Sequence, residues 1–215
     1  MATYLQLVNA VLIRLRETQV SAVSDTAYAT LIGAFVNEAK RQVEDAWKWD
    51  ALNTSITVNT ASGTSTYTVT GIGRRFKDAT VNDTTNDSQL NNVPAQWIRD
   101  QQQLSTVQNG PPIYYAWNGT DGTDSKIELY PTPDGIYALK VNAYVPQVDL
   151  SASADVLTIQ SEAVIAGAYA RALVERGEDA GLASSEAYSL YKAILADHIS
   201  LEASRQTEND CWVPV

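Results

Sequence analysis

The sequence predicts an α+β fold: a bundle of N- and C-terminal helices, an inserted antiparallel β-rich region, and an extended C-terminal tail. Apolar residues recur at three- and four-residue steps near both ends of the chain, which is the period of an amphipathic helix. In the middle, apolar and polar residues alternate, and Thr, Asn, Gly and Pro become frequent, as in strands joined by turns. We therefore expect helices in 1–52, the β-rich insertion with a short helix in 53–150, helices in 151–205, and the tail in 206–215.

Two helices are expected in the first segment. Thr3 is a suitable N-cap for a helix that ends near Thr18, and Ser24 or Asp25 for a longer helix that runs to about Asp50. The charged residues of the longer helix are expected to lie mostly opposite its apolar stripe; they are Glu38, Lys40, Arg41, Glu44 and Asp45. The stripe itself comprises Tyr28, Leu31, Ile32, Phe35, Val36, Ala39, Val43, Ala46 and Trp47.

The inserted segment begins where the period changes to two. Residues 56–59 and 67–69 alternate, and the turn-forming residues 61–64 between them predict a β-hairpin. A third strand is expected at 76–81, and a short helix at 94–104 with Pro94 near its first turn. Three more strands are expected at 113–117, 126–130 and 136–145.

The third segment holds two further helices. Ser161 is expected to cap a helix over 162–176, and Gly177 to end it. Ala and Gly dominate one face of this helix, so a neighbouring helix can approach closely. The last helix is expected at about 184–204, with Leu190, Tyr191, Leu201 and the lone His198 on its buried stripe.

The composition argues against catalysis. One His and one Cys in 215 residues leave almost no basis for a nucleophile–base pair or a metal cluster, so we expect neither an enzyme, nor a cofactor, nor a bound metal. No secretory signal and no membrane-spanning apolar run is recognised, so synthesis in the cytoplasm and no membrane partner are expected. The protein is expected to act through its surfaces.

The charge is negative and unevenly distributed. The net charge is −10, and residues 151–215 alone carry four basic and ten acidic side chains. Such a surface repels nucleic acid. It is consistent with a solvated face that keeps the protein soluble, or with the wall of a channel through which DNA slides without specific binding.

Two glycine-containing loops look like ligand sites but lack essential parts. Gly71-Ile72-Gly73 precedes two arginines, yet a third glycine and a following helix are missing, so a turn at a strand end is expected. The loop Asn118–Asp124 is similar to a calcium loop, but it has no closing Glu and no flanking helices. A hairpin tip is the better interpretation.

The tail is the feature with the strongest indication of a partner. Chain termini usually end in polar residues, whereas this one ends in apolar ones that need a cover. The protein's own body, a neighbouring subunit or another partner could provide it, since such a segment can add to a sheet edge or lie in a groove. The candidate partner-binding residues are Cys211, Trp212, Val213, Pro214 and Val215.

Several segments together resemble the head-to-tail adaptor proteins of tailed bacteriophages, including the tail tubular protein A type of short-tailed phages. The resemblance lies in residues 3–12, which read TYLQLVNAVL, residues 35–47, which read FVNEAKRQVEDAW, residues 129–133, which read LYPTP, and residues 167–179. It extends from Thr3 to about Ser204 and consists of packing and turn residues.

The resemblance implies a structural virion protein of the phage neck. It implies a dodecameric ring between the portal protein and the tail tube or nozzle that extends the DNA channel, with the C-terminal segment gripping the portal. The concentration of acidic residues in 151–215 would suit such a channel wall, so Glu175, Glu178, Asp179 and Glu186 are candidate lumen-facing acids. Asn118, Asp121 and Asp124 are candidates for a loop on the tail side.

Two other functions remain open from the residues. A tail-tip or baseplate component could bind carbohydrate through Tyr114, Tyr115, Trp117 and the 118–124 loop, although such a module does not need helices at both ends. A hydrolase could use a carboxylate pair such as Asp121 and Asp124, but nothing in the sequence orients that pair.

Overall fold

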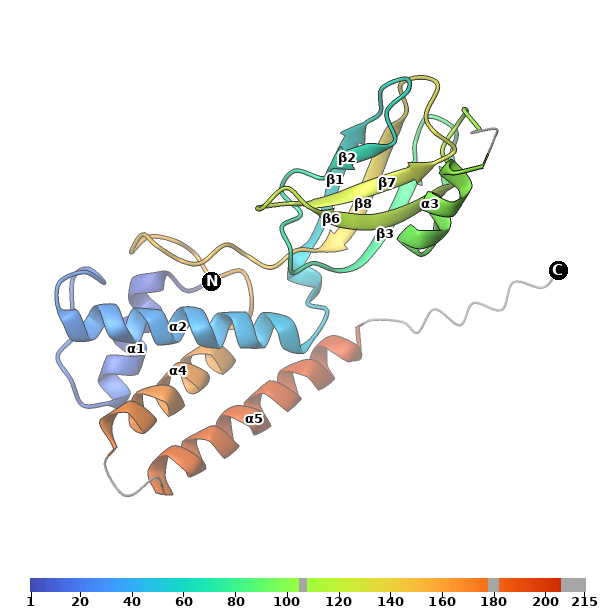
Figure 1. The fold of residues 1–215 in the computed structure, drawn as a ribbon. Coiled ribbons are helices and arrows are strands. Elements are labelled where there is room, and N and C mark those ends of the chain that lie inside the picture. Colours follow the sequence, from blue (N-terminus) through green and yellow to red (C-terminus); the bar gives the residue numbers. More distant parts are fainter. Residues whose placement is uncertain (105–107, 178–181, 206–215) are drawn as a thin grey trace. The chain divides into compact units, whose positions relative to one another are not determined.

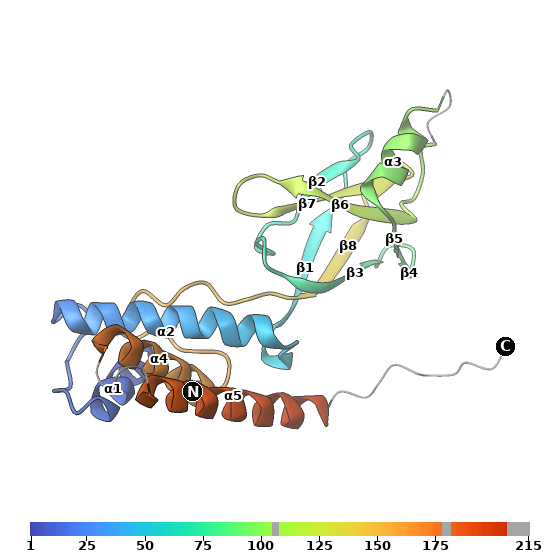
Figure 2. The same ribbon diagram turned by 60° about the horizontal axis from the view of Figure 1, so that its bottom comes forward.

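The computed structural model describes residues 1–104, 108–177 and 182–205. The chain divides into two compact units, one formed by residues 1–51 together with 147 onward, and one by residues 52–146 (Figures 1 and 2). The first, the helical unit, contains helices from both ends of the chain, and the second, the β unit, contains two sheets. The expected α+β fold, with a β-rich region inserted into a helical bundle, is confirmed; the expected tail lies outside the described residues.

Four helices make up the described helical unit. A short 3-10 turn (η1, Asp50–Leu52) follows the second of them along the chain. The helices are α1 (Tyr4–Arg14), α2 (Ala27–Ala46), α4 (Ser161–Arg176) and α5 (Leu182–Ala203).

Local hydrogen bonds explain where these helices begin and end. Thr3 caps α1 with a full capping box, in which its side chain accepts from the Gln6 amide and the Gln6 side chain accepts from the Thr3 amide. Gly177, at φ 64°, ends α4 as expected. Ser161 is the first residue of α4 rather than its cap, and the residue at the cap position, Gln160, makes no side-chain cap bond.

The expected cap of α2 is wrong. Thr26 caps this helix by accepting from the Ala29 amide at 3.0 Å. Asp25 instead accepts three hydrogen bonds, from the amides of Ser21 and Ala22 and from the Ser21 hydroxyl. Because its carboxylate closes the preceding turn, it is not available to the helix, and the next hydroxyl along the chain takes the cap.

Helix α4 is the centre of the bundle. It contacts α1, α2 and α5, and in both views it lies between α2 and α5 (Figures 1 and 2). A Cβ atom added at Gly167 would lie 3.1 Å from the Tyr191 ring and 3.2 Å from the Ala39 Cβ. The small residues of α4 therefore allow two neighbouring helices to approach at once, where the sequence predicted the close approach of one.

An ion pair is buried in α2, contrary to the expectation that its charges face away from the core. Lys40 and Glu44 are 0% and 1% exposed, and their Nζ and Oε1 atoms lie 3.2 Å apart. Lys40 Nζ also donates to the Gln147 carbonyl at 2.5 Å, and the Gln147 amide donates to Glu44 Oε1 at 3.1 Å. The segment that returns from the β unit covers the pair and satisfies it.

This returning segment, residues 147–160, is fixed by further polar contacts. The Asn37 side chain both donates to the Leu150 carbonyl and accepts from its amide, each at 2.9 Å. The Asp155 carbonyl accepts from the Tyr4 amide, and the Ser153 carbonyl accepts from the Leu5 amide. The segment therefore connects α1 and α2. Its backbone groups have no partners in regular secondary structure, and these contacts satisfy several of them.

The β unit is a sandwich of two sheets. The sheet orders are β1-β8-β3-β4 and β2-β7-β6-β5, and all pairs are antiparallel except β5 with β6. Apolar side chains from both sheets, including Val58, Val81, Ile127 and Leu139, form one core between them. The strands are β1 (Asn53–Asn59), β2 (Thr66–Thr68), β3 (Lys77–Asp83), β4 (Ser88–Gln89), β5 (Asn91–Asn92), β6 (Tyr114–Thr120), β7 (Ser125–Tyr130) and β8 (Ala138–Tyr144).

The expected hairpin of 56–59 with 67–69 is wrong. Strand β1 pairs with β8 and β2 pairs with β7, so the turn between them crosses from one sheet to the other. The expected short helix is present as α3 (Ala95–Gln102), whose Ile98 packs on Ala116 and Tyr130. Alternation identified the strands, but it did not identify their partners.

Candidate interaction surfaces

Helix α5 exposes much of its apolar surface. Of its residues, Ala187 and Tyr191 are buried against the bundle, whereas Leu182 is 69% exposed and Leu190 and Leu201 are each 58% exposed. Tyr188 is also exposed. We call Leu182, Leu190 and Leu201, which lie within about 100° of one another around the helix, the α5 apolar face. Exposed leucines on one side of a helix are candidates for contact with another protein.

The stripe predicted for α5 was expected to be buried. Its apolar positions cover too wide an arc for one neighbour, and α4 is the helix that α5 packs against. The width of the stripe was the signal in the sequence. Tyr191 lies at its centre, where burial raises the pKa of its hydroxyl.

A groove on the bundle surface runs alongside Tyr188. Gln42 of α2, Ala170, Arg171 and Val174 of α4, and Tyr188 of α5 line it. Arg171 donates to the Gln42 side chain at 2.6 Å and to the Gly167 carbonyl at 2.9 Å, and Lys192 lies 4.9 Å from the centre of the Tyr188 ring. The groove therefore combines the apolar side chains of Ala170, Val174 and Tyr188 with the positive charge of Arg171, and Lys192 lies next to it.

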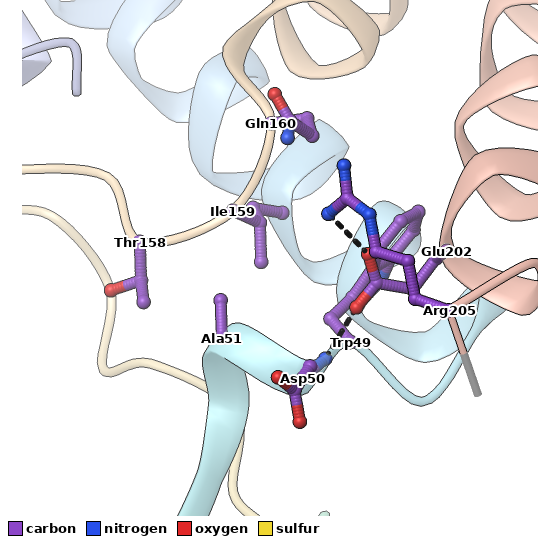
Figure 3. Close-up of a pocket in the computed structure, with 8 residues that line it drawn as sticks. All are labelled: Trp49, Asp50, Ala51, Thr158, Ile159, Gln160, Glu202 and Arg205. Atoms are coloured by element: carbon purple, nitrogen blue, oxygen red, sulfur yellow. Dashed lines mark hydrogen bonds and ion pairs between the residues drawn. The ribbon is translucent and has the colours of Figure 1, made fainter. Parts of the chain in front are cut away.

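A second pocket lies at the C-terminal end of α5 (Figure 3). Glu202 accepts a hydrogen bond from the Asp50 amide at 2.8 Å, and its other oxygen lies 3.6 Å from the Arg205 guanidinium. Trp49 and Ile159 line the same pocket. Through this hydrogen bond from Asp50 to Glu202, the C-terminal end of α5 is held beside the start of η1.

The candidate acidic residues that the structure describes are at the surface. Glu175 is in the last turn of α4 and Glu186 is in the second turn of α5, and both are exposed. Glu178 and Asp179 lie outside the described residues. The candidate partner-binding segment Cys211–Val215 also lies outside them.

The loop 118–124 is the tip of the β6–β7 hairpin. Asp121 is exposed, and its Oδ1 accepts from the amides of Asp124 and Thr123; these hydrogen bonds lower the pKa of its carboxyl group. Asp124 is buried and accepts from the Gly73 amide at 2.8 Å. Asn118 bridges Arg99 and Glu128 at 2.8 and 2.7 Å. Both carboxylates thus serve as acceptors for turn amides.

The aromatic residues that a sugar site would use pack on one another. The Tyr115 ring is buried and its hydroxyl donates to the Ala79 carbonyl at 2.8 Å. Trp117 packs on Phe76 with ring centres 4.4 Å apart, and Tyr114 packs on Trp97 at 4.9 Å. These contacts favour a structural role for the rings over an open stacking platform.

The described part of the chain contains neither a metal-binding cluster nor a membrane-spanning helix. In residues 1–104, 108–177 and 182–205, no group of three or more His, Cys, Asp or Glu side chains converges as it would around a metal ion. No helix in these ranges is long and apolar enough to cross a bilayer.

Comparison with known proteins identifies a family. A family model described as SU10 adaptor protein matches residues 2–210, nearly the whole chain. No curated protein matches the sequence.

Proposed function

Because the chain belongs to the SU10 adaptor protein family, and is therefore a phage adaptor and a virion component, we propose that it forms a ring between the portal and the tail tube or nozzle. In this role the ring extends the DNA channel, and twelve copies close it. The protein is made in the host cytoplasm, catalyses no reaction and needs no cofactor.

The α5 apolar face carries the self-assembly part of this proposal. Its leucines are more than half exposed to water, and their burial against a second copy lowers the free energy of the assembly. The groove beside Tyr188 offers a different surface on the same bundle. A contact between two different surfaces repeats from copy to copy and closes into a ring when the rotation permits.

The C-terminal segment provides a proposed contact with the portal or with a neighbouring subunit. Trp212 and Val213 are its apolar anchors, and Cys211, Pro214 and Val215 complete it. Ten residues follow Arg205, and an extended chain of this length spans about 33 Å. That reach is sufficient for a contact with a neighbouring subunit or with the portal.

The acidic residues suit the wall of a DNA channel. Glu175, Glu178, Asp179 and Glu186 are proposed to face the lumen, where like charge prevents the duplex from adhering as it passes. The hairpin tip with Asn118, Asp121 and Asp124 is proposed as part of the surface toward the tail. DNA would thus pass without specific binding.

A tail-tip component that binds carbohydrate through the β unit is the second candidate. It is favoured only by the number of aromatic residues near the β6–β7 hairpin, and their mutual packing leaves little free ring surface. Binding of the protein to a glycan array, with loss on Trp117→Ala, would support it over the adaptor role.

Negative-stain imaging of the protein mixed with its cognate portal ring tests the proposal. We expect an added layer on the portal with the full chain and none with a chain that ends at Arg205. A layer that survives the truncation would keep the adaptor role and move the portal contact to the helices. No layer with either chain would contradict the proposed function.

A further inference from the structure

Strand β1 is the longest strand at an edge of the described sheets. Within the described residues, β1 has seven residues and one strand neighbour, β8. The strands at the other three sheet edges are β4, β5 and β2, with two, two and three residues. A long edge offers a row of backbone groups to an incoming strand.

The register shows which groups of β1 point outward. Thr60 donates to the Tyr137 carbonyl, and Leu52 accepts from the Val145 amide, so the even-numbered residues of this segment face β8. The amides and carbonyls of Asn53, Ser55, Thr57 and Asn59 therefore point to the free edge. These four residues are uncharged, and their side chains are exposed.

The protections that proteins usually give to an edge are missing from β1. Its sequence, NTSITVN, contains no Pro, no Lys and no other charge, and its pairing with β8 runs without a bulge over all seven residues. Ile56, on the core side of the strand, is only partly buried. An added strand would use the free backbone groups and cover Ile56.

We propose that residues 206–213 of a neighbouring copy pair with the free edge of β1. The segment is long enough, because β1 spans about 23 Å at ~3.3 Å per residue and the ten residues after Arg205 span about 33 Å. Pro214 limits the pairing to the residues before it, since proline has no amide hydrogen.

Charge also fits this segment. Glu208 and Asp210 meet no acidic side chain on β1, and exposed Lys140 stands directly opposite Thr57 on β8. Pairing would also cover the apolar side chains of Trp212 and Val213, whose burial is favourable. The inference rests on the proposed self-assembly, and it gives the segment a receiving surface on the next copy.

Cross-linking in trans tests it, because Cys211 is the one cysteine of the chain. A tagged copy carrying Thr57→Cys and Cys211→Ser is mixed with the natural chain, assembled on the portal, and treated with a short bismaleimide. We expect a cross-linked pair of one tagged and one natural chain. The matched control is Ser88→Cys with Cys211→Ser, which places the thiol on β4 at the opposite edge of the same sheet, and it should give at least tenfold less product.

A second variant tests the backbone contact. Ser55→Pro removes an outward-pointing amide and leaves the β8 ladder intact, so the melting temperature should change little. Added to the Thr57→Cys copy, it should reduce the cross-link severalfold. A layer on the portal without the mixed product, or with equal product from Ser88→Cys, would overturn the inference alone. The absence of any layer would overturn the proposed function together with it.

Discussion

The helical unit and the β unit close their cores to different degrees. In the β unit, two sheets enclose the apolar core, and the most exposed apolar residues, Leu104, Ile113 and Ile136, lie singly on loops. In the helical unit, α4 is enclosed by three helices, whereas α5 leaves its apolar face in water. The β unit exposes backbone groups at β1, and the helical unit exposes side chains.

This difference indicates two ways of meeting other chains. Apolar helix surface binds through area and shape, and it costs free energy until it is covered. A strand edge binds through directional hydrogen bonds and is already solvated when it is free. We therefore expect mutations in α5 to change association strength, and mutations in β1 to change which segment is received.

The largest effect is expected from the buried ion pair of the helical unit. Lys40→Met leaves the Glu44 carboxylate buried without its ammonium partner, so the free energy of unfolding should fall by about 3–5 kcal/mol. Urea denaturation followed by circular dichroism measures it. The double variant Lys40→Met with Glu44→Leu should recover most of the loss, and a single variant that costs less than about 1 kcal/mol would contradict this account.

The next effect concerns the close approach of three helices at Gly167. Gly167→Val places methyl groups against Tyr191 and Ala39, where a Cβ alone already lies at 3.1–3.2 Å. Overpacking of this kind costs about 1–3 kcal/mol. The matched control is Gly135→Val in the β unit, since no atom lies within 4 Å of a Cβ added there. Equal unfolding free energies for the two variants would show that the space around Gly167 is not tightly filled.

Sequence periodicity predicted the helices and the longer strands because each of these elements follows its own hydrophobic pattern, whereas the two-residue strands β4 and β5 have no such pattern and were missed. Glycine and alanine in α4 correctly indicated close packing, and Gly177 correctly ended the helix. The strand pairing of 56–59 was missed, since alternation places a strand on a sheet but does not choose its neighbour. The cap of α2 was missed because three adjacent residues, Ser24, Asp25 and Thr26, are all suitable caps.

The interaction surfaces were harder to predict. Lys40 and Glu44 read as solvent-facing, because the carbonyl that satisfies them belongs to Gln147, more than a hundred residues along the chain. The exposure of Leu190 and Leu201 depends on how many helices surround α5, and the sequence indicates it only through the width of the apolar stripe. The free edge of β1 is likewise a property of the sheet order.

The α5 apolar face should affect association more than folding. Leu190→Gln with Leu201→Gln removes two leucines that are more than half exposed, so the unfolding free energy should change by less than about 1 kcal/mol. Binding of the layer to the portal ring should weaken by about tenfold or more, because covering one leucine is worth about 1.5–3 kcal/mol. Titration followed by imaging measures it. The control, Ile136→Gln in the β unit, should leave both quantities unchanged.

The smallest effect concerns two matching turns of the helical unit in acid. Asp25 and Asp155 close the turns Ser21–Asp25 and Ser151–Asp155, and each accepts from a serine hydroxyl and two amides. These hydrogen bonds lower the pKa of both carboxyl groups. Their stabilisation is therefore present at neutral pH and is lost as the pH falls below about 4, toward the lowered values.

The double variant Asp25→Asn with Asp155→Asn measures the contribution of these turns. It should melt at a lower temperature than the natural chain at neutral pH, and its melting temperature should fall less between about pH 5 and pH 3, since two of the groups that titrate there are gone. The matched control is Asp197→Asn, a change at an exposed position of α5. A double variant whose melting temperature falls as steeply in acid as that of the natural chain would show that other carboxylates, such as Asp121 of the β unit, determine the acid response.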